Sequence, residues 1–167
     1  MSLRQLMVTG ALVVLGSSCS LGDPEDNASL NVFVAVDKST LPTGESMTIT
    51  VTARNVGYDA LTLTGPADCL TFVDVLDSQG TVVWNSSGQC GGATVTEELA
   101  PGENYTESIV WSGSNEAGAR LGAGYYLIRP VARLTGAPYA GPAITVALEG
   151  SFAVVGRPAG AVARGGR

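Results

Sequence analysis

Three cysteines are the residues of this sequence whose chemistry is easiest to assign. Cys69 and Cys90 stand at the ends of a segment that alternates apolar and polar residues, turns at Ser78-Gln79-Gly80 and alternates again. Such a hairpin brings both ends of its paired strands together, so a disulfide between the two cysteines is geometrically easy. Closing a loop of about 20 residues stabilises a fold by roughly 3 kcal/mol in the chain-entropy model. The alternative is a pair of buried free thiols.

The third cysteine, Cys19, ends a segment with the layout of an export signal. Arg4 precedes a short apolar run from Leu6 to Leu15, and small residues follow that run. The run is too short to span a membrane as a helix. We therefore predict that residues 1–19 are an export signal that is absent from the mature protein.

The residues that end this signal, Leu15-Gly16-Ser17-Ser18-Cys19, resemble the bacterial lipobox. In that motif the cysteine is lipidated and becomes the mature N-terminus. If Cys69 pairs with Cys90, lipidation also removes the liability of an unpaired thiol in an exported protein. The resemblance implies a lipid anchor at Cys19 in the bacterial cell envelope, and Ser20, where inner-membrane lipoproteins have Asp, favours the outer membrane. Gly16 stands where the motif usually has Leu, so ordinary signal-peptidase cleavage and free secretion is the alternative.

The sequence carries no recognisable catalytic, cofactor or metal-binding motif. The sequence has no histidine, which excludes Ser-His-Asp and Cys-His arrangements and histidine-based zinc catalysis. It contains no phosphate-binding glycine loop and no dinucleotide fingerprint. Asp68, Asp74 and Asp77 lie near one another, but scattered carboxylates on strands and turns are usually solvated; a calcium site is the alternative. We predict a non-enzymatic protein with no catalytic residues, cofactor or metal.

Composition favours an all-β domain that binds neither nucleic acid nor anionic lipid. Only 14% of the residues are charged, Gly is frequent at 22 residues, and the net charge is −6. Val- and Thr-rich runs with many glycines suit strands joined by tight turns. A negative chain lacks the basic stripe that nucleic acid requires, so any membrane contact should be made only by a lipid at Cys19.

Short alternating segments separated by Gly, Pro and Asn predict an immunoglobulin-like antiparallel β-sandwich of seven or eight strands. We expect this sandwich over residues 30–155, after a flexible tether over residues 20–29 and before a disordered tail over residues 156–167. Besides the hairpin between the cysteines, the expected strands cover 30–36, 46–55, 93–99, 104–111, 125–134 and 143–155.

Several single residues carry structural expectations within this sandwich. Trp84 and Trp111 are expected in the core rather than on a ligand platform. Asn55 should bond to nearby backbone where its strand ends. Pro130 should lie at an edge or a bulge, because it has no N–H to donate. Tyr125, after Leu121 and Ala123, resembles the tyrosine corner of Greek-key sandwiches.

A series of motifs in order gives one functional lead. It comprises Phe72 to Trp84, then Leu99-Ala100-Pro101-Gly102-Glu103, then Trp111, then Gly124-Tyr125. Over roughly residues 30–134 this order resembles the BsuPI family, which is named for an intracellular proteinase inhibitor of bacilli. The resemblance implies an immunoglobulin-like fold and binding to a protein partner, with a protease as the named candidate. An export signal and cysteines within the domain are departures from the namesake.

The long polar connection at residues 112–124 is the candidate partner-binding loop. Loops of this length without an element of their own are often functional. An inhibitory loop would be held extended and would add to the protease cleft as a strand; Asn115, Arg120 and Leu121 are the candidate contact residues. The alternative is a non-inhibitory surface or assembly protein of the envelope that binds its partner through a sheet edge or end loops.

Overall fold

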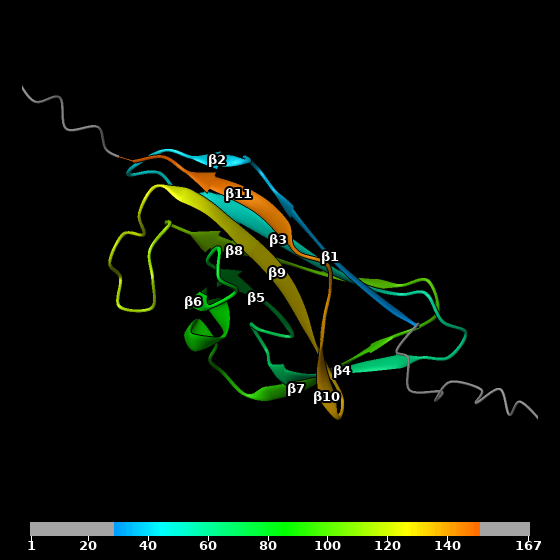
Figure 1. The fold of residues 1–167 in the computed structure, drawn as a ribbon. Helices are drawn as coiled ribbons and strands as arrows, with labels where there is room; N and C mark the ends of the chain where they lie inside the picture. The colour runs from blue at the N-terminus through cyan, green and yellow to red at the C-terminus, as the bar shows by residue number, and fades with distance from the viewer. Residues whose placement is uncertain (1–28, 151–167) are drawn as a thin grey trace, which may run out of the picture.

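The fold is a sandwich of β-strands arranged in two sheets (Figure 1). The computed structural model describes residues 29–150, and this range contains eleven strands and one short 3₁₀ helix. The predicted export signal, the lipidation site at Cys19 and the predicted tail lie outside the described residues. Among residues 29–150, no helix is long and apolar enough to cross a membrane.

The smaller sheet has three antiparallel strands in the order β1-β3-β8. They are β1 (Leu30–Val36), β3 (Met47–Asn55) and β8 (Asn104–Trp111). Its central strand β3 shows why the sequence forms this layer: every second side chain, Met47, Ile49, Val51 and Ala53, is fully buried. The alternation of period two gives the strand one face for the core and one for solvent.

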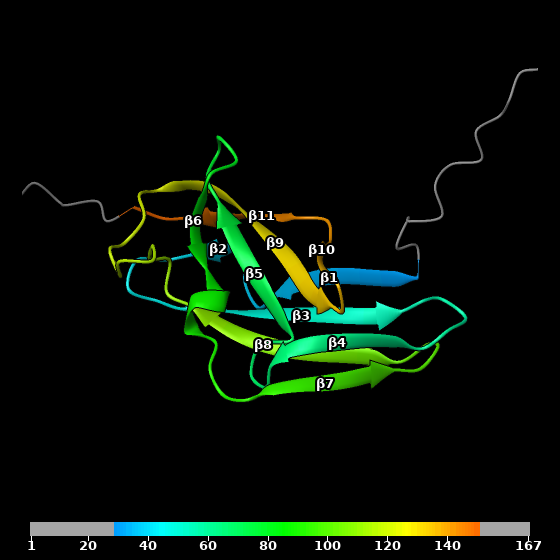
Figure 2. The ribbon, with the colours of Figure 1, turned by 90° about the horizontal axis from the view of Figure 1, so that it is seen from below.

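The larger sheet is organised around β9 (Gly124–Leu134), which pairs antiparallel with β11, β10, β5 and β4. Only β2 pairs in parallel, with β11. The other strands of this sheet are β2 (Thr40–Leu41), β4 (Leu61–Pro66), β5 (Thr71–Leu76), β6 (Val82–Asn85), β7 (Thr94–Leu99), β10 (Ala137–Ala140) and β11 (Ile144–Leu148). In Figure 2 the strands β5 and β9 cross the layer of β1, β3 and β8 at an angle.

The predicted all-β sandwich is confirmed, with more strands than the seven or eight expected. The additional strands are weak in sequence: β2 has two residues, and β10 lies in a Gly- and Pro-rich segment that reads as a turn. Leu61–Pro66, which lies in none of the expected strands, forms β4 and pairs with β7. The pairing leaves no local signal in the sequence, because the two strands are distant along the chain: the register runs from Leu61↔Leu99 to Pro66↔Thr94.

The core lies between the two layers and contains both tryptophans, as predicted. Trp84 is 5% and Trp111 1% exposed, and their ring centroids are 6.0 Å apart. Tyr126 meets Trp111 edge-on at 6.5 Å. Because Trp84 comes from β6, Trp111 from β8 and Tyr126 from β9, this aromatic cluster joins the two sheets.

Pro130 does not lie at an edge or a bulge; it lies within the central strand β9. Gly141 N donates to Pro130 O, so the backbone of Pro130 faces the side where β10 and β11 pair with β9. The pairing of β10 ends at Ala140↔Val131 and that of β11 begins at Ile144↔Ile128. Pro130 thus faces the gap between two partner strands, where its missing N–H breaks no ladder bond.

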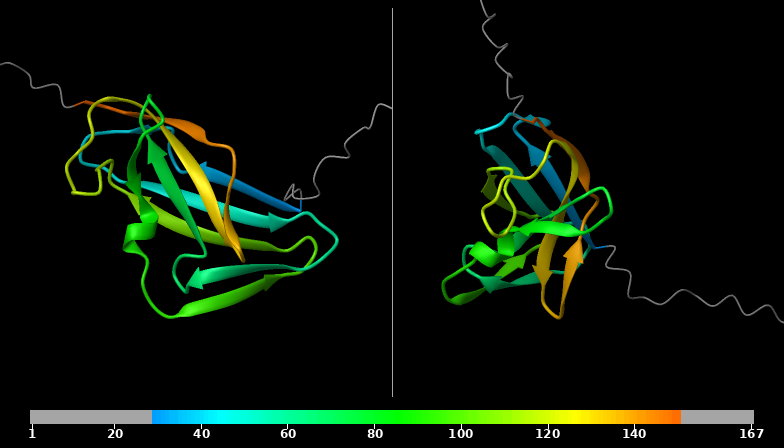
Figure 3. Two further views of the ribbon diagram at one scale, coloured as in Figure 1. Left: turned by 60° about the horizontal axis from the view of Figure 1, so that its bottom comes forward. Right: turned by 60° about the vertical axis from the view of Figure 1, so that its left-hand side comes forward.

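The tyrosine corner is formed by Tyr126 rather than by Tyr125. Tyr125 is 74% exposed, whereas the Tyr126 hydroxyl donates to Gly122 O at 3.0 Å. Side chains of β9 alternate between its two faces, and of the two adjacent tyrosines only Tyr126 points toward the other sheet. Figure 3 shows the connection that this bond fixes, the loop between β8 and β9, at the end of the sandwich opposite the β3–β4 connection.

Candidate functional site

The disulfide between Cys69 and Cys90 is present, with its Cα atoms 5.5 Å apart. Cys69 lies just before β5, and Cys90 follows the 3₁₀ helix η1 (Ser86–Gln89). Asn85 caps that helix by accepting from Ser87 N at 2.6 Å. The disulfide therefore closes the β5–β6 hairpin at its open end, and the alternative of two free thiols is excluded. A disulfide of this kind is typical of an oxidising compartment outside the cytoplasm.

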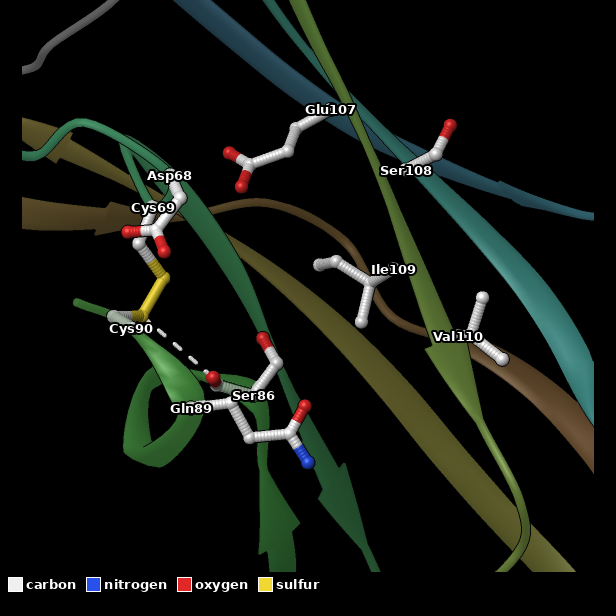
Figure 4. A pocket seen from close by; sticks show the side chains of 9 residues that line it. All are labelled: Asp68, Cys69, Ser86, Gln89, Cys90, Glu107, Ser108, Ile109 and Val110. Atoms are coloured by element: carbon white, nitrogen blue, oxygen red, sulfur yellow. Dashed lines mark hydrogen bonds between the residues drawn. A yellow bond between two sulfur atoms is a disulfide. The ribbon is translucent and has the colours of Figure 1, made fainter. Parts of the chain in front are cut away.

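A hollow of about 200 Å³ lies beside this disulfide, between η1 and β8 (Figure 4). The disulfide forms one wall, and β8 forms the opposite wall. Figure 4 shows Glu107 and Ile109 directed from β8 toward the disulfide side, and Ser108 and Val110 directed away. Its lining residues are Asp68, Cys69, Ser86, Gln89, Cys90, Glu107, Ser108, Ile109 and Val110.

Glu107 connects the two sheets across this hollow. Its carboxylate accepts from Thr71 N at 3.1 Å and from Thr71 Oγ1 at 2.9 Å. Burial raises the pKa of Glu107 above its ordinary value, the Thr71 bonds oppose that rise, and the Asp68 carboxylate adds to it. Burial likewise raises the pKa of the neighbouring Tyr105, with Glu107 adding to the rise.

Asp68 is the second carboxylate at the hollow. It accepts from Gly91 N at 3.0 Å, which fixes it at the rim beside the disulfide. Within residues 29–150 the ion pairs are Lys38–Glu45 and Arg129–Asp74. Neither carboxylate of the hollow therefore has a cationic partner in the described part of the chain.

Strand β8 also has an unpaired side next to the hollow. Among residues 29–150, β8 pairs with β3 alone. Asn55 N donates to Glu103 O at 3.0 Å, so the odd-numbered residues of β8 turn their backbone groups toward β3. The backbone groups of Asn104, Thr106, Ser108 and Val110 consequently point away from the sheet, and we call these groups the open edge.

Two other edges of the sandwich, those of β1 and β7, are protected in ways that the open edge is not. The free side of β1 is covered, because a Cβ on Gly141 would lie 1.9 Å from Val32 O. Strand β7 carries the adjacent exposed charges Glu97 and Glu98. Charge and coverage are the usual means by which proteins prevent strand addition at an edge. The outward side chains of β8 are uncharged, and Val110 is 63% exposed.

The candidate contact residues of the loop, Asn115, Arg120 and Leu121, lie close together, but Asn115 and Leu121 make backbone bonds within the loop itself. Asn115 closes a tight turn, since Asn115 N donates to Ala119 O at 2.8 Å and its Oδ1 accepts from Ala119 N at 2.9 Å. Leu121 N donates to Gly113 O at 2.9 Å. The loop is therefore a closed, internally bonded turn and not an extended segment.

Arg120 is directed inward rather than toward a partner. Its guanidinium donates to Pro42 O at 3.1 Å and also to Ser112 O. These bonds tie the loop to the turn between β2 and β3. The longest exposed run of the loop is 116–119, and Ser112, Gly122 and Ala123 are also exposed.

The remaining acidic residues of the hairpin have structural roles. Asp74 is not solvated as expected: it is 7% exposed, and Arg129 Nη2 lies 2.6 Å from its Oδ2. Asp77 accepts from Gln79 N and Thr81 N, each at 2.9 Å, and so shapes the turn of the hairpin. No group of three or more His, Cys, Asp or Glu side chains placed to hold a metal is found in the part of the chain that the structure describes.

The fold and the disulfide place the chain in a broad class of proteins, the all-β sandwiches, with the β5–β6 hairpin closed by a disulfide. Neither a protein-family model nor a curated protein matches the sequence, so no family is assigned.

Solved structures give only distant similarities. The β-glucosidase EmGH1 from Erythrobacter marinus aligns with a TM-score of 0.44 and 11% identity over 72% of this chain and 15% of its own. Dimeric latent PorU from Porphyromonas gingivalis aligns with a TM-score of 0.45 and 21% identity, over 74% of this chain and 10% of its own. The sporulation control protein Spo0M from Bacillus subtilis aligns with a TM-score of 0.47 and 11% identity, over 72% of this chain and 49% of its own. The chain thus spans less than half the length of these proteins, and at such TM-scores they carry no functional argument.

Proposed function

We propose that this protein is an exported, non-enzymatic protein-binding module and that its partner adds a strand to the open edge of β8. The observation that supports this proposal is the unpaired, uncharged side of an eight-residue strand. An exposed strand edge offers a row of N–H and C=O groups with the spacing that an extended peptide needs. Main-chain hydrogen bonds would supply affinity, and the side chains that flank β8 would supply specificity.

The location that we propose is the bacterial cell envelope, with a lipid on Cys19 as the anchor and the outer membrane as the favoured site. The Cys69–Cys90 disulfide supports the export of the chain, and the resemblance of residues 15–19 to a lipobox supports the lipid. Incorporation of a labelled fatty acid would test the anchor. Label should be incorporated into the wild-type chain and be lost from Cys19→Ser, whereas a wild-type chain without label would indicate free secretion.

Proteinase inhibition is the candidate activity, supported by the BsuPI resemblance of residues 30–134. A protease binds its substrate as an extended strand, so a rigid strand edge or a fixed loop can occupy the cleft without being cleaved productively. The purified chain should be titrated against subtilisin-like and trypsin-like proteases. Inhibition at a one-to-one ratio is the expected result. Full protease activity at a large excess of the chain, together with an envelope protein that it retains, would favour the assembly role.

A proline substitution on the open edge tests the binding element directly. The backbone N–H of Ser108 points away from β3, toward the open edge. Ser108→Pro therefore removes no bond to β3 but blocks strand addition. Ser78→Pro is the matched control, because Ser78 lies in the exposed Asp77–Gly80 turn, at the position that favours proline. Partner retention or inhibition should be lost in Ser108→Pro and kept in Ser78→Pro. Equal retention by both folded variants would exclude the open edge.

A further inference from the structure

The open edge and the hollow lie side by side, and β8 supplies part of both. A strand added to β8 would lie about 4.8 Å from it, with side chains alternating between the two faces. The residue opposite Glu107 or Ile109 would point to the same face as these side chains. That face is the one on which the hollow opens (Figure 4). One side chain of the incoming strand would therefore enter the hollow.

We propose that this side chain is basic, a Lys or Arg that extends between the carboxylates of Asp68 and Glu107. The inference rests on the proposed binding of a strand at the open edge. The disulfide and Ile109 are apolar surfaces on the two opposite walls of the hollow. A long methylene stem can pack between them while the charged head reaches the carboxylates.

The charges of the site select for this occupant. Glu107 is bonded by the neutral donors of Thr71 and Tyr105, and Asp68 by the neutral N–H of Gly91. A cationic head would make charge-assisted hydrogen bonds to both. An acidic side chain would add a third negative charge to the same space, and a neutral one would leave the carboxylates without a counter-charge.

The same charges argue against a second copy of this chain as the occupant. Strand β8 has the sequence Asn-Tyr-Thr-Glu-Ser-Ile-Val-Trp, without Lys or Arg. Pairing two β8 strands would bring the Glu107 and Asp68 carboxylates of both copies together, in a protein whose net charge is already −6. Like charges facing each other at an interface oppose association. The edge is therefore better suited to a different, basic strand.

The test uses the full, oxidised chain and synthetic nine-residue peptides of alternating Thr and Val. The central residue of each peptide is Lys, Gln or Glu, and binding is followed by fluorescence polarisation. The Lys peptide should bind roughly ten-fold more tightly than the Gln peptide, because partly buried charge-assisted bonds typically have this effect. The Glu peptide should bind most weakly. Ser108→Pro should abolish all three interactions.

Removing one carboxylate identifies the hollow as the origin of the preference. Asp68→Asn should bring the affinities for the Lys and Gln peptides close together, and Glu107→Gln should do the same. Glu149→Gln, which makes the same charge change at an exposed site after β11, should leave the ten-fold preference intact. The Asp68 variant keeps the conclusion testable if the loss of the Glu107–Thr71 bonds unfolds the other variant.

The outcomes separate this inference from the proposed function. Equal binding of Lys and Gln peptides, lost in Ser108→Pro, would overturn the basic subsite and leave strand addition standing. If the wild-type chain sediments as a dimer and the Ser108→Pro variant as a monomer, the occupant of the open edge is a second copy of this chain and not a basic strand. If no peptide binds and Ser108→Pro also leaves partner retention unchanged, both proposals are wrong.

Discussion

Gly141 lies where β1 passes the connection between β10 and β11, and it should tolerate no side chain. A Cβ there would lie 1.9 Å from Val32 O and 2.8 Å from Val32 C, and backbone atoms cannot move aside as a flexible side chain can. We expect Gly141→Ala to lower the free energy of unfolding by about 2 kcal/mol or more, because overpacking forces the backbone to shift. Urea denaturation of the full chain measures this loss.

Gly122→Ala is the matched control for that substitution. Apart from its two chain neighbours, nothing lies within 4 Å of the position that its Cβ would take, and the alanine keeps the carbonyl that accepts from Tyr126. The change in unfolding free energy should stay within about 0.5 kcal/mol. If both alanine variants lose the same stability, general glycine flexibility and not the contact with β1 is responsible.

Asn55 is a fully buried polar residue whose amide cannot be replaced by a carboxylate. Its Nδ2 donates to Asp59 O and Leu99 O, each at 2.8 Å, and its Oδ1 accepts from Gly57 N. Asn55→Asp places a carboxylate against two carbonyl oxygens and should cost roughly 2–4 kcal/mol of stability. Asn31→Asp, on the exposed face of β1, should cost little in the same denaturation experiment.

The pH dependence of the Asn55 variant gives an independent check. At low pH the introduced carboxyl is protonated and can donate one bond, so the deficit of Asn55→Asp against the wild type should shrink between pH 7 and pH 4. A deficit that is constant with pH would mean that the loss comes from packing rather than from the charge.

Single residues also show the limit of sequence interpretation at this scale. The structural role of Asn55 and the burial of both tryptophans were predictable, because each follows from the residue type and its place at a strand. The choice between Tyr125 and Tyr126 was not, since adjacent residues of a strand face opposite sides. Only the register of β9 against its neighbours decides which phenol reaches Gly122.

At the scale of elements, the disulfide stabilises the β5–β6 hairpin and η1 together. Cys69 and Cys90 are 21 residues apart, and opening a loop of this size releases roughly 3 kcal/mol of chain entropy into the unfolded state. The double variant Cys69→Ser/Cys90→Ser should lose about this amount in urea denaturation. Reduced wild-type chain should lose a similar amount, and an unchanged midpoint in both would mean that hairpin packing alone holds this region.

The bond between β8 and β5 through Glu107 should make stability depend on pH. The pKa of Glu107 is raised in the fold, mainly by burial. A carboxyl with a raised pKa binds its proton more tightly in the folded than in the unfolded chain, so protonation favours folding. The free energy of unfolding should therefore rise, relative to Glu107→Gln, as pH falls through the raised pKa toward the ordinary value of 4.5.

Denaturation of wild type and Glu107→Gln at a series of pH values between 7 and 4.5 isolates this effect. The other carboxylates titrate in both chains and cancel in the difference. A difference that is flat, or that falls toward low pH, would contradict the raised pKa. A flat difference would mean that the Thr71 hydrogen bonds offset burial, and a falling one that they outweigh it.

The hairpin could be predicted from sequence but the site beside it could not. The β5–β6 hairpin has its strands, turn and cysteines in one continuous segment. The hollow needs Thr71 and Glu107, which are 36 residues apart, to meet across the sandwich. An inhibitory role would have required the loop at residues 112–124 to be extended, but Arg120 and Asn115 close it through backbone bonds. Long-range contacts of this kind are set by the packing of the sheets and leave no local pattern.

At the scale of the whole molecule, the aromatic cluster makes the two sheets one cooperative unit, and the chain's tryptophans report on it. The sequence contains two tryptophans; Trp84 comes from the larger sheet and Trp111 from the smaller one. Tryptophan emission should therefore shift to the red when the layers separate, while far-ultraviolet circular dichroism follows the strands. Because each sheet buries its apolar face only against the other, neither should persist alone.

We expect the emission and dichroism curves of the oxidised chain to have the same urea midpoint, as two-state unfolding requires. Trp84→Phe and Trp111→Phe should each shift that midpoint to lower urea for both probes together, with a larger shift for Trp111, which also donates its indole N–H to Ser114 O at 3.0 Å. Emission that changes before dichroism would show that the layers open while the strands remain paired. In that case the open edge of β8 would belong to a sheet that can separate from the disulfide hairpin, and the hollow between them would form only in the closed sandwich.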